Sequence, residues 1–264
     1  MRMEFIDTHC HINFGQFRDD LSSVITSARK AGVRKFVVPG VDAVTSETAV
    51  KLSQKYPGDI IPAVGFHPYE AQRTDPSGAA RHLESMLKKC PYAAVGECGL
   101  DYHIYKGHEA TGKKDAQKFL LETHLRLAIR YGRTATIHCR DAFDDLFDLI
   151  DSLPRLPKAV LHCFSGGMRQ VRQAEERKLL MGVDGNVTYS KQLAANVRSI
   201  PLSNLLLETD SPLLTPVPLR GRRNEPKNLR LVARAVAAIK GVPLPEVAEI
   251  TGHNSRSMFF AYYG

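Results

Sequence analysis

The sequence predicts an α/β fold, a (β/α)8 barrel closed by C-terminal helices. Eight short apolar runs alternate with longer segments of helical periodicity, and the length of 264 residues is close to that of a typical barrel. The competing architecture, an open doubly wound sheet, normally carries a glycine-rich phosphate loop after its first strand. That position here reads HCHINFGQF, so the barrel is favoured. We expect a single domain over residues 1–264.

The expected strands are short runs bounded by turn residues. In order they are EFIDTH (4–9), KFVVPG (35–40), IIPAVGFH (60–67), AAVGECG (93–99), TATIHC (134–139), KAVLHCF (158–164), LLMGVDGNVT (179–188) and NLLLETD (204–210). Strands that alternate with helices form a parallel sheet, so their C-terminal ends meet at one end of the barrel.

The expected helices fill the intervals between these strands. Segments 19–32, 113–132 and 141–153 have helical periodicity, and glycines stand just past the expected helix ends at Gly32 and Gly132. After the eighth strand, segments 226–241 and 243–264 are expected to form two closing helices.

The composition is that of an ordinary globular protein, with 43% hydrophobic and 24% charged residues. No apolar run reaches the length of a membrane span and the N-terminus is no signal peptide, so we expect a cytoplasmic protein, monomeric by default and without a membrane partner. The net charge of +8 would favour a polyanionic substrate. The five cysteines include no CxxC pair. Those that follow candidate site residues are expected to be buried behind the site, namely Cys10, Cys98, Cys139 and Cys163.

Ionisable residues occur at the expected C-terminal ends of five strands, where barrel enzymes place their active sites. In TATIHC the alternation of a strand sets His138 opposite Ile137, so the histidine is expected inside the barrel. Buried imidazoles and carboxylates are costly without a partner, and a metal ion would supply one. The candidate metal ligands are His9, His11, Glu97, His138, His162 and Asp210.

The carboxylate on the fourth strand decides the expected number of metals. Glu97 offers two oxygens that could bridge two cations, which a single-metal site would not need. We expect two divalent cations, with Zn, Mn, Mg or similar as candidates. An imidazole-rich site suits the transition metals better than Mg. One ion is assigned to His9, His11 and Asp210, the other to His138 and His162, with Glu97 bridging.

Nine motifs then resemble one family along the whole chain. They are DTHCHI, VGFHP, GECGLDY, IHCRDA, HCFSG, GNVT, ETDSPLLTP, RGRRNEP and NSRSMF, and they resemble the TatD-family metal-dependent hydrolases, deoxyribonuclease-like members of the amidohydrolase-like barrels. The resemblance implies a two-metal centre on the same six residues and phosphodiester hydrolysis of DNA. Cys98 and His103 depart from the family motif GEIGLDYY, and His124 stands where the family has Gln. His103 is expected at the rim, where it could change substrate choice.

The expected reaction is cleavage of DNA phosphodiester bonds by a hydroxide bridging the two metals, as an exonuclease on single strands. Asp210 and Glu97 are the catalytic candidates, and Asp210 is expected to act as general base. The residues expected to contact substrate lie at strand ends and in the basic loop RGRRNEP: they are His67, Arg140, Arg223 and Asn224.

Two alternatives stay open. The same dinuclear centre could hydrolyse a small phosphoester, a lactone or an amide, because a fold does not determine its substrate. Alternatively the protein could be a non-catalytic nucleic-acid-binding barrel with structural metals. The basic loop favours DNA or another phosphate-bearing substrate, and six ligands shared by two ions would leave coordination positions open for water.

Overall fold

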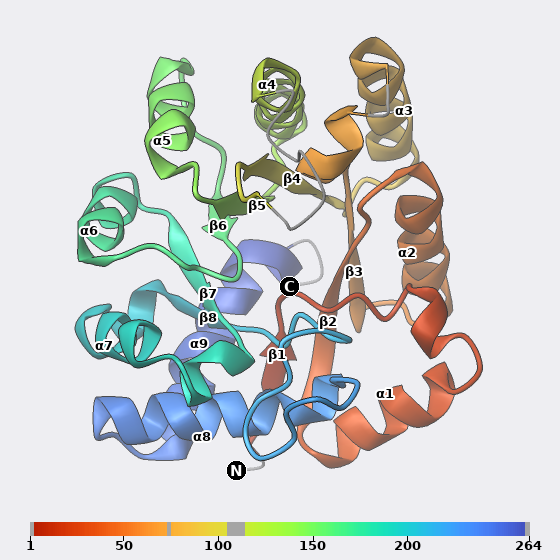
Figure 1. The fold of residues 1–264 in the computed structure, drawn as a ribbon. Helices are drawn as coiled ribbons and strands as arrows, with labels where there is room; N and C mark the ends of the chain where they lie inside the picture. Colours follow the sequence, from red (N-terminus) through yellow and green to blue (C-terminus); the bar gives the residue numbers. More distant parts are fainter. Residues whose placement is uncertain (1–2, 73–74, 105–113, 262–264) are drawn as a thin grey trace.

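The computed structural model describes residues 3–72, 75–104 and 114–261, and it confirms the predicted barrel (Figure 1). Eight parallel strands form one sheet in sequence order. They are β1 (Phe5–Asp7), β2 (Val33–Pro39), β3 (Ile60–Val64), β4 (Ala94–Asp101), β5 (Ala135–Arg140), β6 (Ala159–Leu161), β7 (Leu180–Val183) and β8 (Leu205–Leu207).

The barrel is closed by backbone hydrogen bonds between the segments at β8 and β1. The Thr8 amide donates to the Leu207 carbonyl at 3.1 Å, and the Asp210 amide donates to the His9 carbonyl at 2.9 Å. These bonds satisfy backbone groups that would otherwise be exposed on two open edges. They also bring the segment after β8 beside the segment after β1.

The helices surround the strands, as Figure 1 shows. They are α1 (Leu21–Lys30), α2 (Ala43–Lys55), α3 (Pro76–Lys89), α4 (Lys114–Tyr131), α5 (Phe143–Ser152), α6 (Met168–Glu176), α7 (Lys191–Ser199), α8 (Leu229–Lys240) and α9 (Leu244–Ser255). The two expected closing helices are α8 and α9, and α8 ends at Gly241 in the left-handed conformation that glycine favours. Residues 113 and 262–264 of the expected helices lie outside the described residues.

Apolar side chains fill the half of the barrel at the N-terminal ends of the strands. This lower cluster contains residues of six strands and two aromatic residues that follow α9: Ile6, Val37, Ile61, Ala63, Ala94, Val160, Leu206, Phe259 and Phe260. Because α9 packs against β1 and β8, it places Phe259 and Phe260 across this end of the barrel. A second and larger cluster fills the layer between the sheet and the outer helices.

Six strands end earlier than predicted, β2, β3 and β6 among them. At the other three the chain turns away from the sheet once its polar residues begin. β1 ends at Asp7, β7 at Val183 and β8 at Leu207. His9 and His11 therefore lie in the segment after β1 rather than on the strand. That segment is still fixed by the backbone, since the Cys10 amide donates to the Val37 carbonyl at 3.1 Å and the His11 amide to the Ser211 carbonyl at 2.8 Å.

A bulge in β4 sets the direction of Glu97. Val95 pairs with Ala135 and Cys98 with Ile137, so three steps on β4 match two on β5. Gly96 and Glu97 together lie opposite Thr136. Glycine suits position 96 because φ there is +133° and a Cβ atom would lie 2.5 Å from the Thr136 carbonyl oxygen. Bulges redirect side chains beside active sites, and this one turns Glu97 inward while Cys98 packs in the outer core.

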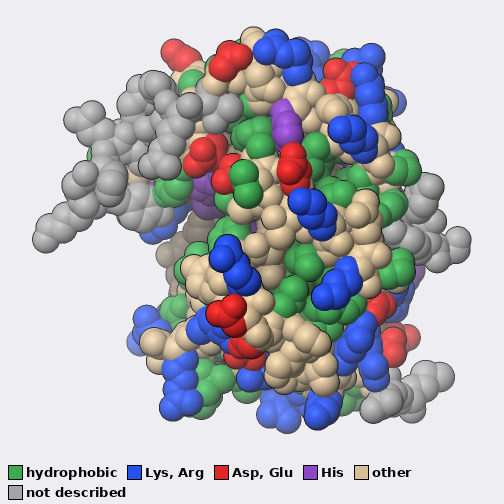
Figure 2. Space-filling model, turned by 90° about the vertical axis from the view of Figure 1, so that its right-hand side faces the viewer, with side chains coloured by type: hydrophobic (Ala, Val, Ile, Leu, Met, Phe, Trp, Pro, Cys, Tyr) green, Lys and Arg blue, Asp and Glu red, His purple; other side chains and the backbone are tan. Residues whose placement is uncertain are grey.

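The positive charge is spread out over the face formed by α1, α2 and α3. Figure 2 shows Lys and Arg side chains there dispersed among acidic and apolar ones, without a continuous basic patch. None of the helices formed by the described residues combines the length and apolar character of a membrane span.

Candidate metal centre

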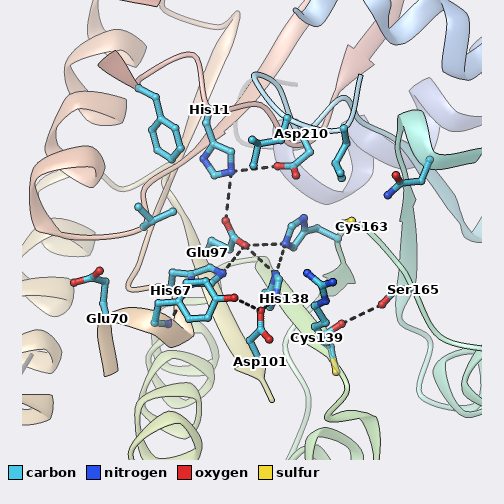
Figure 3. Close-up of a pocket in the computed structure, with 18 residues that line it drawn as sticks. His11, His67, Glu70, Glu97, Asp101, His138, Cys139, Cys163, Ser165 and Asp210 are labelled. Atoms are coloured by element: carbon cyan, nitrogen blue, oxygen red, sulfur yellow. Dashed lines mark hydrogen bonds and ion pairs between the residues drawn. The ribbon is translucent and has the colours of Figure 1, made fainter. Parts of the chain in front are cut away.

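A cavity of about 570 Å³ opens at the C-terminal end of the barrel. His11, His67, Glu97, His138 and Asp210 line it, and Figure 3 shows that their side chains converge on its floor. They come from segments far apart in the sequence, which the barrel brings together because its parallel strands all end here.

The first group of candidate metal ligands surrounds one oxygen of Glu97. The Nε2 atoms of His9 and His11 lie 3.2 Å apart, and they are 3.3 and 3.5 Å from Glu97 Oε2. Asp210 Oδ1 lies 3.3 Å from His11 Nε2 and 3.9 Å from His9 Nε2. These four atoms can hold one metal ion.

The second group surrounds the other oxygen of the same carboxylate. Glu97 Oε1 lies 2.8 Å from His162 Nε2 and 3.2 Å from His138 Nδ1, and these two nitrogens are 3.2 Å apart. His67 Nε2 approaches the same oxygen at 3.5 Å. The two groups adjoin, because the His9 and His162 rings stack with centroids 3.8 Å apart.

Partners on neighbouring strands fix the tautomers of the histidines. His11 Nδ1 faces the Pro39 carbonyl at 3.3 Å, and His138 Nε2 faces Asp101 Oδ2 at 3.0 Å. Both partners only accept hydrogen bonds, so these nitrogens carry the hydrogen. The other nitrogen of each ring faces Glu97 and can offer its lone pair to a cation once the ring is neutral, as outer-shell partners of metal-binding histidines typically arrange.

The donor atoms fit a cation better than they fit one another. With hydrogen on Nδ1 of His11, its Nε2 atom faces the carboxylate oxygens of Glu97 and Asp210 as acceptor against acceptor. Asp210 Oδ1 is buried and has no hydrogen-bond partner among the described residues. Such a cluster needs a proton or a cation between its members, and one divalent ion satisfies all of them at once.

The electrostatic environment keeps the key carboxylates ionised. Burial would raise the pKa of Glu97, but the surrounding histidines, His162 and His67 foremost, lower it well below its usual range. Burial reduces the pKa of His67 to about 3. Burial would also lower the pKa of His138, yet its hydrogen bonds to Asp101 and Glu97 raise it to about 9. A cation at His138 Nδ1 must therefore displace a proton.

Two of the four predicted substrate residues lie at the cavity, and two do not. His67 and Arg140 line it. Arg223 instead binds Asp20 at 2.6 Å and Glu225 at 3.2 Å, which holds the loop after β8 against the end of the segment before α1. Asp20 and Arg223 are far apart in the sequence, so the sequence alone does not reveal this ion pair.

Asn224 also has a different position from the one expected. Its side chain is 0% exposed, and its amide group donates to the carbonyls of Thr209 and Leu213 at 2.8 Å each. Its Oδ1 atom accepts hydrogen bonds from Glu225 and Asn228. Because its amide group is used within the protein, Asn224 positions the loop that follows Asp210.

The sequence reasoning missed Asp101. This buried carboxylate accepts hydrogen bonds from His138 and from the Tyr69 hydroxyl, and Gln117 holds its backbone amide at 2.8 Å. A signal was present, because Asp101 follows Glu97 by four residues in GECGLD and shares its face of the strand.

The cysteines and the two departures from the family motifs are placed as follows. Cys10, Cys98 and Cys139 are buried as expected, whereas Cys163 is half-buried. Cys139 and Cys163 both line the cavity, so neither lies wholly behind the site. His103 follows β4 and binds Asp141 at 2.8 Å. His124 is fully buried in α4 and accepts a hydrogen bond from the Phe66 amide at 3.0 Å, a structural role.

Comparison with known proteins agrees with this geometry. The model of the family described as TatD related DNase matches residues 6–260. The chain belongs to this family. The membership confirms the predicted family and the predicted class of enzyme, a metal-dependent hydrolase.

Relatives of TatD type cover nearly the whole chain. The uncharacterised metal-dependent hydrolase YabD of Bacillus subtilis is 33% identical over 96% of this chain and 98% of its own. The protein named 3'-5' ssDNA/RNA exonuclease TatD of Edwardsiella piscicida is 32% identical over the same shares. The crystal structure of the TatD homologue YjjV of Escherichia coli superimposes with a TM-score of 0.89 at 30% identity, covering 98% of this chain and 99% of that one.

Proposed function

We propose that the protein is an exonuclease that hydrolyses phosphodiester bonds of single-stranded DNA with two divalent cations. The observation that carries the proposal is the division of Glu97 between two imidazole groups. Its Oε2 atom faces His9 and His11, and its Oε1 atom faces His138 and His162. A carboxylate that bridges two cations needs its oxygens directed in this way. The names of several TatD relatives support the substrate class and attack from the 3' end.

Each cation would have its own set of ligands. Divalent cations bound here would lower the pKa of a coordinated water and screen charge on the phosphoryl oxygens. The imidazole-rich donor set favours Zn, Mn or a similar transition metal over Mg. The proposed ligands are His9, His11 and Asp210 for one cation and His138 and His162 for the other, with Glu97 shared.

Asp210 is the proposed general base. Burial would raise the pKa of Asp210, but the neighbouring imidazoles, His11 foremost, lower it, so the group is a carboxylate at neutral pH. Its Oδ1 atom faces His11, which leaves Oδ2 to accept the proton of the attacking water and return it to the leaving oxygen. His67 and Arg140 line the same cavity, where they would orient the phosphate.

The test uses purified, metal-stripped protein and end-labelled single-stranded DNA. Mg, Mn or Zn is added back in turn, with an Asp210→Ala variant beside each. We expect metal-dependent shortening from one end that the variant lacks. If protein with two bound ions cleaves no strand, the nuclease proposal is wrong. The alternative of a small phosphoester, lactone or amide would then take its place.

The remaining predictions concern the protein as a whole. A single domain over residues 1–264, a monomer and a cytoplasmic location stay predictions. Size-exclusion chromatography with light scattering would test the monomer directly.

A further inference from the structure

The loop after β8 carries four cationic residues that differ in their partners. Arg223 is paired with Asp20, and Lys227 is paired with Glu225 at 2.7 Å. Arg220 and Arg222 are exposed and form no ion pair with any residue in the described part of the chain. Two of the four positive charges are therefore neutralised within the protein, and the other two are available to an anion.

Arg220 is held in a defined place by an aromatic ring. Its guanidinium group lies over the ring of Tyr189, 4.1 Å from the ring centroid. The Tyr189 hydroxyl donates to Asn186, which lines the catalytic cavity. The Val217 amide donates to the Thr188 hydroxyl at 2.9 Å, which joins the two loops that carry the pair. The Tyr189–Arg220 pair therefore lies beside the cavity, in direct contact with its lining residue Asn186.

Exposed apolar side chains accompany the pair at the same rim. Tyr189 is 37% exposed and Leu213 is 56% exposed, and Leu213 lines the cavity itself. Val217, on the same loop, is also exposed. Large apolar groups beside a cavity are typical of surfaces that a ligand covers.

This combination matches the chemistry of an unpaired nucleotide. Bases of single strands stack on aromatic rings and on guanidinium planes, and the backbone phosphates pair with unneutralised arginines. A small neutral substrate would use neither feature.

We propose that Tyr189 and Arg220 form a platform on which a base of the single-stranded substrate stacks, with Arg220 and Arg222 binding the adjoining phosphate. The inference rests on the proposed function and adds to it the surface that selects unpaired strands. A base in a duplex already stacks on its neighbours, so the platform favours strands whose bases are free.

The test compares two strands of equal length, one with bases and one made of abasic nucleotides. For the metal-loaded Tyr189→Ala variant we expect KM for the base-containing strand to rise about tenfold, the effect of losing one stacked base. Its KM for the abasic strand should equal that of the wild type. Tyr189→Phe should restore the low KM, because phenylalanine retains the stacking face.

Two further variants separate stacking from charge and from general damage. Arg220→Gln should raise KM and reduce the salt dependence of binding by about one phosphate contact. Phe119→Ala removes an aromatic side chain on α4 that is 51% exposed, and it should change no kinetic constant.

The outcomes distinguish this inference from the proposed function. A wild type that cleaves DNA while Tyr189→Ala keeps the wild-type KM would overturn the platform alone. An equal loss on both strands would also overturn it, because the loss would then not depend on bases. A metal-loaded wild type that cleaves neither strand would overturn the proposed function and the platform together.

Discussion

The two halves of the barrel interior are built from the same strands but from different residue types. In β6, Val160 packs in the lower cluster, and His162, directly after the strand, faces Glu97. In β8 and the segment after it, Leu206 packs below and Glu208 is buried above. The lower half stabilises the fold by apolar burial. The upper half collects buried ionisable groups that oppose folding unless a partner satisfies them. The barrel thus separates the source of its stability from the site of its chemistry along each strand.

The largest effect is expected for Glu97→Gln. Removing one bridging charge should lower DNA cleavage about a thousandfold, a loss typical of a key electrostatic contact in a transition state. Elemental analysis should show fewer than two metal ions per chain. Glu122→Gln, on the exposed surface of α4, is the matched control and should behave as wild type. Full metal content in Glu97→Gln would contradict the bridging role.

The opposite pattern is expected for Phe259→Ala in the lower cluster. Truncating this buried ring should lower the free energy of unfolding by about 3–5 kcal/mol. Cleavage per folded molecule and metal content should not change, which denaturant titration and elemental analysis would measure. The exposed Phe119→Ala should shift stability by less than about 0.5 kcal/mol. If Phe259→Ala also loses metal, the two halves of the barrel are not independent.

Metal addition should stabilise the protein through the upper half alone. Mn²⁺ at about 100 times its dissociation constant should raise the free energy of unfolding by about 2.7 kcal/mol, and EDTA should reverse the gain. Denaturant midpoints with and without metal measure the effect. The gain should persist in Phe259→Ala and be reduced in Glu97→Gln. An equal gain in all three proteins would place metal binding elsewhere.

A smaller effect is expected for Asp101→Asn. Asparagine can still accept the hydrogen bond from His138 Nε2, but it lacks the negative charge that strengthens this ligand. Metal affinity at the His138 side should fall about tenfold, within the range for outer-shell partners. Calorimetric titration should show the change in one binding step only. Equal weakening of both steps would indicate a general loss of structure.

The smallest effect is expected for Arg223→Gln. This variant tests whether the substrate site extends beyond the cavity to Arg223. Its guanidinium is bound to Asp20 on an exposed surface, where ion pairs contribute little. Both kinetic constants should stay within about twofold of wild type. Arg140→Gln is the comparison, and it should raise KM about tenfold because a charged hydrogen bond to phosphate is lost. A tenfold rise for Arg223→Gln would restore the expectation made from the sequence.

The sequence was sufficient to predict the fold and the residues that converge, because both follow from local patterns. Alternation along β5 assigns His138 to the interior, and parallel strands bring their ends together. The family motifs then reinforced the same six positions. Residues at strand ends therefore carried the information about the site.

The sequence was insufficient where a residue's role depends on a distant partner. From the sequence, Arg223 and Asn224 were both expected to contact the substrate. In the fold, Arg223 is paired with Asp20. The Asn224 amide group donates to the carbonyls of Thr209 and Leu213. The direction of Glu97 depends on a bulge that simple alternation does not reveal. Such pairings are tertiary, so local propensity cannot predict them.

The lower cluster has a consequence for how the protein is made. It joins Ile6 of β1 to Phe260 beyond α9, so contacts within it span nearly the whole described chain. A ribosome adds about 5–20 residues per second, so the last packing partner of Ile6 is synthesised roughly 13–50 s after Ile6 itself. The growing chain carries unpaired strand edges throughout this interval, and such edges are prone to aggregation. The segment after α9 supplies Phe259 and Phe260 to the lower cluster, so this cluster cannot be completed before that segment is synthesised.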